Sequence, residues 1–405
     1  MKFASVFVIL SAALASAEVT PGELLMAEMN CAACHAPTDD VRARLASRSS
    51  PLVGAEGVNA SPEWLREFLL DSQKTKPGTL MPDMLHALPP EKRAEAAESL
   101  THFLVSIQGP PKPLHEDAAG KSGEGKALYH AVGCAQCHAP TFASAGNEDE
   151  LAALAASSVP LAGPQIAKKY SRGELAAFLV DPLRSRPGGR MPSLNLSGAE
   201  ASSIAAFLLG ADGAKSRTAF TVDPSKVTAG AQYFSSLQCV NCHSGTAISK
   251  PEPAARSLAA LRVRQPGGCL AVKPSARAPK FELTDRQRIV ILAGLRGLDV
   301  LALPLTETQQ IRRTMTALNC YACHSRERRG GIIGLHREYL TNDQSAPSLS
   351  ELGAKVPIAR IREALTTGKK TRDSIPLRMP VFGKGNIDHL PELFEKADKA
   401  SAGKP

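Results

Sequence analysis

Amphipathic stretches recur along the chain and predict that it is mainly helical. Apolar residues recur at helical spacing in four of these stretches, at 89–105, 197–209, 284–295 and 390–397. Another helical stretch precedes each of four Cys-containing segments, at 23–26, 126–129, 231–234 and 311–318. We therefore expect the same helix–loop–helix order to recur along the chain.

Two further stretches, after Ser61 and after Ser171, are nearly parallel in sequence and begin with strong helix-start signals. Pro62 follows Ser61 directly, which predicts an N-cap with proline at the first helical position. Glu174 follows Ser171 at the spacing of a capping box. Both predicted helices end at loops rich in Pro and Gly, at 76–78 and 186–189.

The order of elements repeats with a period of roughly 95 residues. Linkers rich in Gly, Pro and small polar residues separate the first repeats. We therefore predict four tandem helical modules followed by a frayed tail. The predicted ranges are 18–110, 111–213, 214–303 and 304–400 for the modules and 401–405 for the tail.

The pattern Cys-x-x-Cys-His occurs once in each predicted module. The first to fourth motifs are Cys31-Ala32-Ala33-Cys34-His35, Cys134-Ala135-Gln136-Cys137-His138, Cys239-Val240-Asn241-Cys242-His243 and Cys320-Tyr321-Ala322-Cys323-His324. A Cys-x-x-Cys pair alone can belong to a zinc site, a redox dithiol or a local disulfide. However, a zinc ribbon needs no His directly after each pair, and no βαβ pattern typical of a redox dithiol is visible. Four repeats closed by His instead indicate c-type haem, attached by two thioethers with the adjacent His on the iron.

A Met-Pro pair precedes the closing helix in three of the modules, at Met81-Pro82, Met191-Pro192 and Met379-Pro380. The order of elements resembles the class I cytochrome c module over nearly the whole chain. That order is an N-terminal helix, Cys-x-x-Cys-His, a middle helix, a Met-bearing loop and a closing helix. The resemblance implies four covalently bound haem c groups with iron. It also implies these axial ligands: His35, His138, His243, His324, Met81, Met191 and Met379.

The third module departs from this pattern. Ala278 stands at the aligned ligand position, and the interval from His243 is only 35 residues, against 53 from His138 to Met191. The middle helix is therefore expected to be lost or truncated. Cys269, the one cysteine outside the motifs, lies nine residues before Ala278. Three alternatives follow for the third haem: ligation by Cys269, an open sixth site, or a ligand from another module such as Met315 or His336. A structural cysteine with no role at the iron is the alternative without chemistry.

The N-terminus has the features of a secretory signal. Lys2 precedes a short apolar run, and Ala15-Ser16-Ala17 is a small-residue cleavage site. We predict a signal peptide at 1–17, cleavage near Ala17, and a mature chain in the periplasm or another exported compartment. No later stretch has the length of a membrane span, so no transmembrane segment is expected in the mature chain.

The formal net charge is +9, or +8 without Lys2. Eight propionates and four ferric irons would bring the loaded protein to about +4 when oxidised and about 0 when reduced. Nucleic acid is therefore not an expected partner. Arg326, Arg328 and Arg329 form a local basic patch that could contact an acidic redox protein, or could be a solvated loop.

These features favour an exported tetrahaem cytochrome c that transfers electrons between redox protein partners, either as a free shuttle or as a subunit of a larger oxidoreductase. Electron transfer needs no acid, base or nucleophile, so no catalytic residue is assigned. The alternative is a haem-dependent oxidoreductase in which the third haem, with His243 and Cys269, is a catalytic or small-ligand site. A small-gas sensor at that haem is a third hypothesis, disfavoured because no output domain is visible.

Overall fold

The computed structural model describes residues 19–46, 48–57, 59–109, 120–138, 161, 163–210, 219–250, 255–261, 267–276, 278–332, 345–369 and 375–402. Within these ranges the chain is mainly helical, with one small two-stranded sheet. This confirms the mainly α fold class. The predicted signal peptide and His336 lie outside the described residues.

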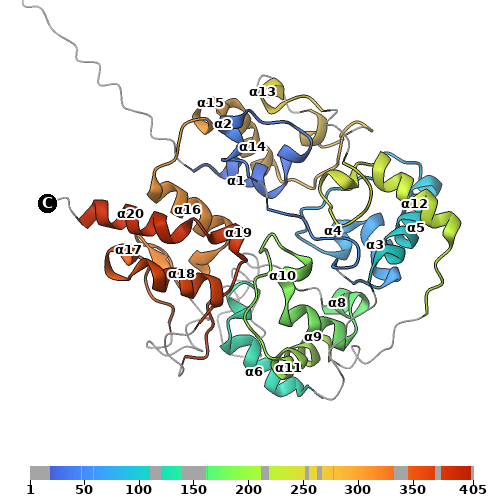
Figure 1. The fold of residues 1–405 in the computed structure, drawn as a ribbon. Helices are drawn as coiled ribbons and strands as arrows, with labels where there is room; N and C mark the ends of the chain where they lie inside the picture. Colours follow the sequence, from blue (N-terminus) through green and yellow to red (C-terminus); the bar gives the residue numbers. More distant parts are fainter. Residues whose placement is uncertain are drawn as a thin grey trace, which may run out of the picture.

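The helices gather into four lobes, which we name A to D (Figure 1). Lobe A contains α1 (Pro21–Glu28), α2 (Asp39–Arg42), α13 (Leu258–Leu261), α14 (Asp285–Arg296) and α15 (Leu298–Leu301). Lobe B contains α3 (Pro62–Leu70), α4 (Ser72–Thr75), α5 (Pro90–Ile107) and α12 (Pro224–Ser236). Lobe C contains α6 (Ser122–Ala131), α8 (Gly163–Lys169), α9 (Arg172–Val180), α10 (Pro182–Ser185) and α11 (Gly198–Leu209). Lobe D contains α16 (Glu307–Ala317), α17 (Leu352–Lys355), α18 (Ile358–Thr367), α19 (Lys384–Ile387), α20 (Leu390–Ala402), β1 (Ser325–Arg326) and β2 (Arg329–Gly330).

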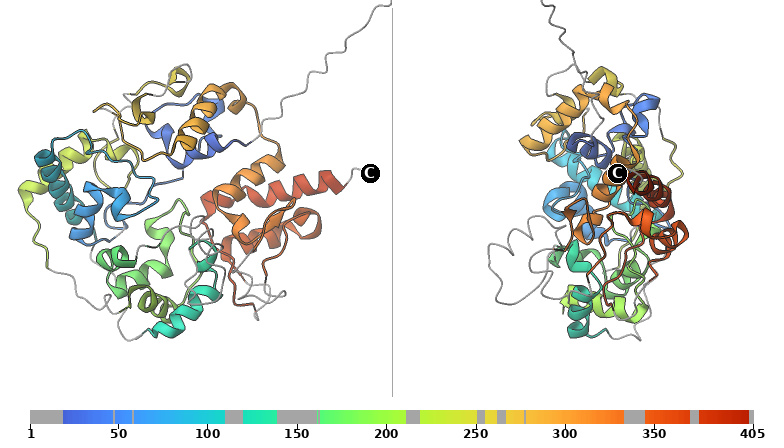
Figure 2. Two further views of the ribbon diagram at one scale, coloured as in Figure 1. Left: turned by 180° about the vertical axis from the view of Figure 1, so that it is seen from behind. Right: turned by 90° about the vertical axis from the view of Figure 1, so that its left-hand side faces the viewer.

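The lobes form a ring in the order A, B, C, D, which is seen from both sides in Figures 1 and 2. Backbone hydrogen bonds join A to B and C to D through their loops. Lobes B and C meet where Ser61 N donates to Lys169 O at 3.1 Å. Lobes D and A meet where Arg48 Nη2 donates to Ala317 O at 2.6 Å. Each lobe therefore has a neighbour on both sides.

The chain segments 18–110 and 214–303 do not form one lobe each. Helix α1 of the first segment packs on α14 of the other, and α5 packs on α12. The core of lobe B accordingly combines Trp64 and Leu100 with Phe234, and that of lobe A combines Met26 with Ile291. Each of the two predicted modules, 18–110 and 214–303, therefore contributes helices to both lobes. The described elements of lobe C lie within 111–213, and those of lobe D within 304–402.

A glycine nine residues before the first Cys of a motif explains three of the helix crossings. A Cβ on Gly22 would lie 2.1 Å from Val290 O of α14. The corresponding distances are 1.9 Å from Gly125 to Ser203 O of α11 and 2.1 Å from Gly230 to Ser99 O of α5. These backbones approach so closely that only glycine fits. Lobe D has Ile311, fully buried, at the same position in α16.

The caps that the sequence predicts are formed. Ser61 accepts a hydrogen bond from Trp64 N at the start of α3, and Ser171 with Glu174 forms a capping box at α9. The four predicted closing helices correspond to α5, α11, α14 and α20, although α20 continues to Ala402. Within the described ranges, no helix has the length and apolar composition needed to cross a membrane.

Gly125→Ala is expected to lower the free energy of unfolding by about 1–3 kcal/mol, because the added methyl group would overlap the Ser203 carbonyl. Gly123 lies in the same helix, and a Cβ added there would have nothing within 4 Å. Gly123→Ala is therefore the matched control and should be neutral or stabilising by about 0.4–1 kcal/mol. Calorimetry of both variants checks the pair, and equal melting temperatures would contradict the close crossing.

Candidate haem sites

The four Cys-x-x-Cys-His motifs share one backbone conformation. Each occupies a single 3₁₀ turn: η1 (Cys31–Ala33), η2 (Cys134–Gln136), η4 (Cys239–Asn241) and η6 (Cys320–Ala322). The residue before each turn has positive φ, and is Asn30, Gly133, Gln238 or Asn319. The His amide then donates to the carbonyl of the first Cys at 2.8–3.0 Å in every motif. The left-handed residue is a feature of the site that sequence reasoning missed, although Asn and Gly are the residues that adopt it most readily.

Three of the motif histidines donate from Nδ1 to a backbone carbonyl. His35 contacts Arg256 O at 2.6 Å, and His324 contacts Pro347 O at 2.8 Å. His243 contacts Pro51 O at 2.9 Å. Since a carbonyl only accepts, the proton is on Nδ1 and Nε2 retains the lone pair that can bind iron. Burial lowers the pKa of His243 and of His324, which favours the same neutral form.

The first and third motifs are supported by each other's segments. Arg256, the partner of His35, belongs to segment 214–303, whereas Pro51, the partner of His243, belongs to segment 18–110. The backbone agrees, because Val53 N donates to Ser244 O at 2.9 Å and Leu258 N donates to Ala36 O at 3.2 Å. The loop that holds each histidine is thus contributed by the other segment.

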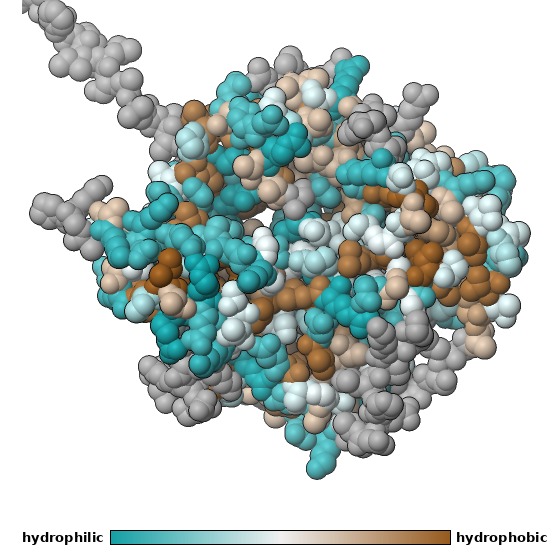
Figure 3. All heavy atoms as spheres, viewed as in Figure 1, coloured by the Kyte–Doolittle hydropathy of each residue, from teal (hydrophilic) through white to brown (hydrophobic). Residues whose placement is uncertain are grey.

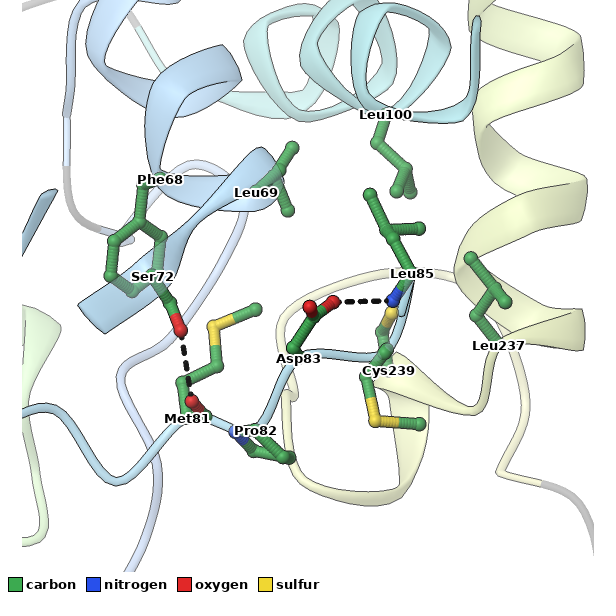
Figure 4. Close-up of a pocket in the computed structure, with 11 residues that line it drawn as sticks. Phe68, Leu69, Ser72, Met81, Pro82, Asp83, Leu85, Leu100, Leu237 and Cys239 are labelled. Atoms are coloured by element: carbon green, nitrogen blue, oxygen red, sulfur yellow. Dashed lines mark hydrogen bonds between the residues drawn. The ribbon is translucent and has the colours of Figure 1, made fainter. Parts of the chain in front are cut away.

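Met81 lies in lobe B, beside the third motif. It lines a pocket that Phe68 and Leu100 border from segment 18–110 and that Leu237 and Cys239 border from segment 214–303 (Figure 4). Its loop is fixed locally, because Ser72 Oγ donates to Met81 O at 3.2 Å. The pairing of Met81 with His35 stays a prediction, and the described pocket places Met81 beside Cys239 of the third motif.

Cys269 lies in lobe A on η5 (Gly268–Leu270), where it packs in the same apolar cluster as Cys31 of the first motif. It packs half-buried against the apolar core of that lobe, and burial raises the pKa of its thiol. Ligation of the third haem by Cys269 stays one of the predicted alternatives, and the contacts of Cys269 in the structure are with the lobe that contains the first motif. Met315, another candidate for that iron, is fully buried in the core of lobe D.

Met191 packs against the core of lobe C, and Met379 lies in the loop before α19. Their loops are joined by an antiparallel bridge between Ser193 and Val381, two residues after each methionine. The equivalent bridge joins Asp83 and Lys280, two residues after Met81 and Ala278. The described lobes therefore form two pairs, A with B and C with D, with the same register at the ligand loops.

The motifs of each pair are also close together. Asn241 Nδ2 of the third motif donates to Cys34 Sγ of the first at 3.6 Å. Asn319 Nδ2, directly before the fourth motif, donates to Cys137 Sγ of the second at 3.7 Å. Groups attached at these cysteines would be neighbours within each pair.

The motif cysteines sit in apolar surroundings. Burial raises the pKa of five of their thiols to about 12: Cys31, Cys134, Cys239, Cys320 and Cys323. All nine cysteines are free of disulfides. In the part of the chain that the structure describes, no three His, Cys, Asp or Glu side chains are arranged to hold a metal ion. Uncharged, buried thiols fit thioether attachment to a porphyrin better than zinc thiolate ligation.

A cluster of cations between lobes B and C fits the carboxylates of a haem. The ammonium group of Lys76 has no hydrogen bond or ion pair with the described residues, and burial lowers its pKa to about 8. Buried Lys169 lies 4.2 Å from the Trp64 ring centroid, and its pKa is also lowered by burial. Among the described residues, no hydrogen-bond partner is found for the buried Nε of Arg186. Propionates are anions that would compensate these charges.

Apolar surface also gathers over lobe B on the face shown in Figure 3, whereas lobe D is largely hydrophilic there. The predicted basic patch on lobe D is smaller than expected. Arg326 is buried and paired with Asp398 at 2.6 Å, which leaves Arg328 and Arg329 exposed on the hairpin.

Comparison with known proteins agrees with this site. Residues 122–212, which contain the second motif and Met191, match the family model of cytochrome c. This segment is similar to cytochrome c. It supports a c-type cytochrome with covalently bound haem c and its iron, and with haem-based electron transfer. No curated protein and no solved structure matches the chain.

Proposed function

We propose that the protein is an exported tetrahaem cytochrome c that relays electrons between redox proteins. One observation carries the proposal: the fold of the second motif, which lies in the segment similar to cytochrome c, recurs at the other three. In all four motifs the histidine amide donates to the carbonyl of the first Cys. Because the four motifs share this conformation, we infer the same chemistry at each.

Haem c, when bound, supplies an iron that gains or loses one electron. The residues of the chain have separate tasks around it. Two cysteines of each motif would hold the group, and the histidine would bind it through Nε2, which the Nδ1–H bonds leave free at His35, His243 and His324. The Nδ1–H bond to a carbonyl orients the ring and increases its basicity. Where a methionine also held the iron, its thioether would favour a high reduction potential. The adjacency of attachment sites within each lobe pair favours transfer inside that pair.

If the protein is instead an oxidoreductase, lobe A is the best candidate for its catalytic haem. Lobe A is the lobe with Ala278, and not methionine, in its ligand loop. A haem there could use its sixth position for a small ligand, while those of the other lobes would transfer electrons. Exposure of the reduced protein to carbon monoxide separates the two functions, because a pure electron carrier with four six-coordinate haems would show no spectral change.

The haem content tests the proposal directly. The mature chain is expected to carry four haem c groups and to begin near Glu18 after export. Intact-mass spectrometry should show the mass of residues 18–405 plus four haems, and an alkaline pyridine spectrum should give the same stoichiometry. Replacement of Cys134 and Cys137 by serine should reduce the count to three. A wild-type count other than four would overturn the tetrahaem proposal.

A further inference from the structure

We propose that segments 18–110 and 214–303 exchange their haem-binding halves. Met81 then completes the haem of the third motif, and the haem of the first motif is the one without a methionine ligand. This inference rests on the proposed haem function and reverses the assignment that a contiguous module would give. The physical basis is the set of contacts that each motif makes across the two segments.

The pocket in lobe B provides the first argument. Met81 and Cys239 line the same pocket, although they are 158 positions apart in the chain. Leu100 of α5 and Leu237 complete it from the two segments (Figure 4). A methionine and the first cysteine of a motif on one apolar cavity are the arrangement that a covalently attached, methionine-ligated haem requires.

The histidine supports provide the second argument. His243 is oriented by Pro51, from the same segment as Met81. Segment 18–110 therefore contributes two parts of the third haem site: the carbonyl that orients His243 and the loop that contains Met81. His35 is oriented by Arg256, from the segment that has Ala278 at the aligned ligand position.

Helix packing provides the third argument. Helix α12, directly before the third motif, crosses α5 at Gly230, and the crossing is so close that a Cβ would lie 2.1 Å from Ser99 O. An ion pair spans the same crossing, with Lys226 Nζ on α12 3.3 Å from Glu98 Oε1 on α5. An N-terminal helix and a closing helix in contact define one haem-binding unit, so the unit of the third motif contains the loop of Met81.

The consequence is a specific asymmetry within the A–B pair. The haem of the third motif becomes a His/Met haem like those of lobes C and D. The haem of the first motif lies in the lobe with Ala278, next to Cys269 and to His86, whose Nε2–H donates to Ala278 O at 2.8 Å. Any ligand exchange, small-molecule binding or low potential is thus assigned to the first motif and not to the third.

Variants of the proximal histidines test the assignment. The wild type should show three methionine-to-iron charge-transfer bands in its oxidised spectrum. His243→Ala should leave two, because it removes the partner of Met81, whereas His35→Ala should leave three. Met81→Ala should also leave two, and combining it with His243→Ala should remove no further band. Contiguous modules give the opposite result, with a band lost in His35→Ala and retained in His243→Ala, which would overturn the proposal.

A second measurement needs no variant and covers the case in which a histidine variant fails to mature. Zero-length carbodiimide coupling of the wild-type holoprotein should join Lys226 to Glu98 within one chain, as identified by peptide mass spectrometry of the monomer band. Lys168 and Glu67, 2.8 Å apart between lobes C and B, are the positive control. If the Lys168–Glu67 cross-link forms and the Lys226–Glu98 cross-link does not, the exchange is overturned. A haem count other than four would overturn the proposed function instead.

Discussion

Ala278→Met is expected to create a fourth methionine-ligated haem and to raise the midpoint potential of the haem of the first motif. Ala278 lies two residues before Lys280, at the register where Met81 lies two residues before Asp83. Its backbone is therefore already placed as a ligand loop, and only the side chain is missing. Axial ligands span roughly 0.8 V of haem potential, so a gain on the order of 0.1 V is expected at this haem.

A spectroelectrochemical titration would measure this change, together with the number of methionine-to-iron bands in the oxidised spectrum. Ala276→Met is the matched control, since Ala276 is exposed in the same loop and should leave four potentials and three bands unchanged. If carbon monoxide binds the wild-type protein, Ala278→Met should also abolish that binding. An unchanged titration and an unchanged band count in a four-haem variant would show that position 278 does not face the iron.

The local features of this site could be predicted from the sequence because they depend on neighbours in the chain. The capping box of Ser171 and Glu174 needs only residues three apart, and each Cys-x-x-Cys-His turn is closed within five residues. The Met-Pro pairs stand out for the same reason. Each of these signals is a short pattern with a direct physical cause.

The assignment of halves to lobes could not be predicted in this way. It depends on the closing helix against which each N-terminal helix packs. Gly22 and Gly230 have the same local pattern, so the sequence around them does not distinguish α14 from α5 as the partner. The short interval between His243 and Ala278 indicates that the third segment departs from the repeat. The interval alone favours a truncated middle helix over an exchange between segments. In the structure, the longer middle region with α3 and α4 serves the third motif instead.

We expect the two lobe pairs to differ in their reduction potentials. Lobes C and D both have methionine in the loops that meet at Ser193 and Val381. Lobes A and B have the same contact but only one methionine, so their potentials are expected to differ. Two haems with unequal reduction potentials suit a point where electrons enter or leave the protein. Two haems with similar reduction potentials suit electron transfer from one haem to the other. The lobe with Ala278 is therefore the expected point of contact with a substrate or partner.

Glu23→Gln is expected to lower the free energy of unfolding by about 3–5 kcal/mol. The Glu23 side chain is fully buried, and Arg44 is bound to it by two hydrogen bonds, of 2.9 Å from Nε and 2.6 Å from Nη2. Arg313 Nε, from lobe D, lies 3.2 Å from the same carboxylate. Neutralising Glu23 would leave two guanidinium groups in a buried site without a counter-charge. The loss is large because burial of an uncompensated charge costs more than the ion pair contributes.

The substitution should also loosen lobe A from lobe D, because Arg44 Nη1 donates to Leu303 O at 3.1 Å and Arg313 donates to Arg44 O. Chemical denaturation of the haem-loaded protein, followed by the haem absorbance, measures the change. Glu67→Gln is the matched control: its pair with Lys168 is about half exposed, so its loss should cost less than about 1 kcal/mol. Equal losses in the two variants would contradict a structural role for the buried carboxylate. A larger loss for Glu23→Gln, with the haem count unchanged, would identify this ion triad as the junction that holds the A–B pair against the C–D pair.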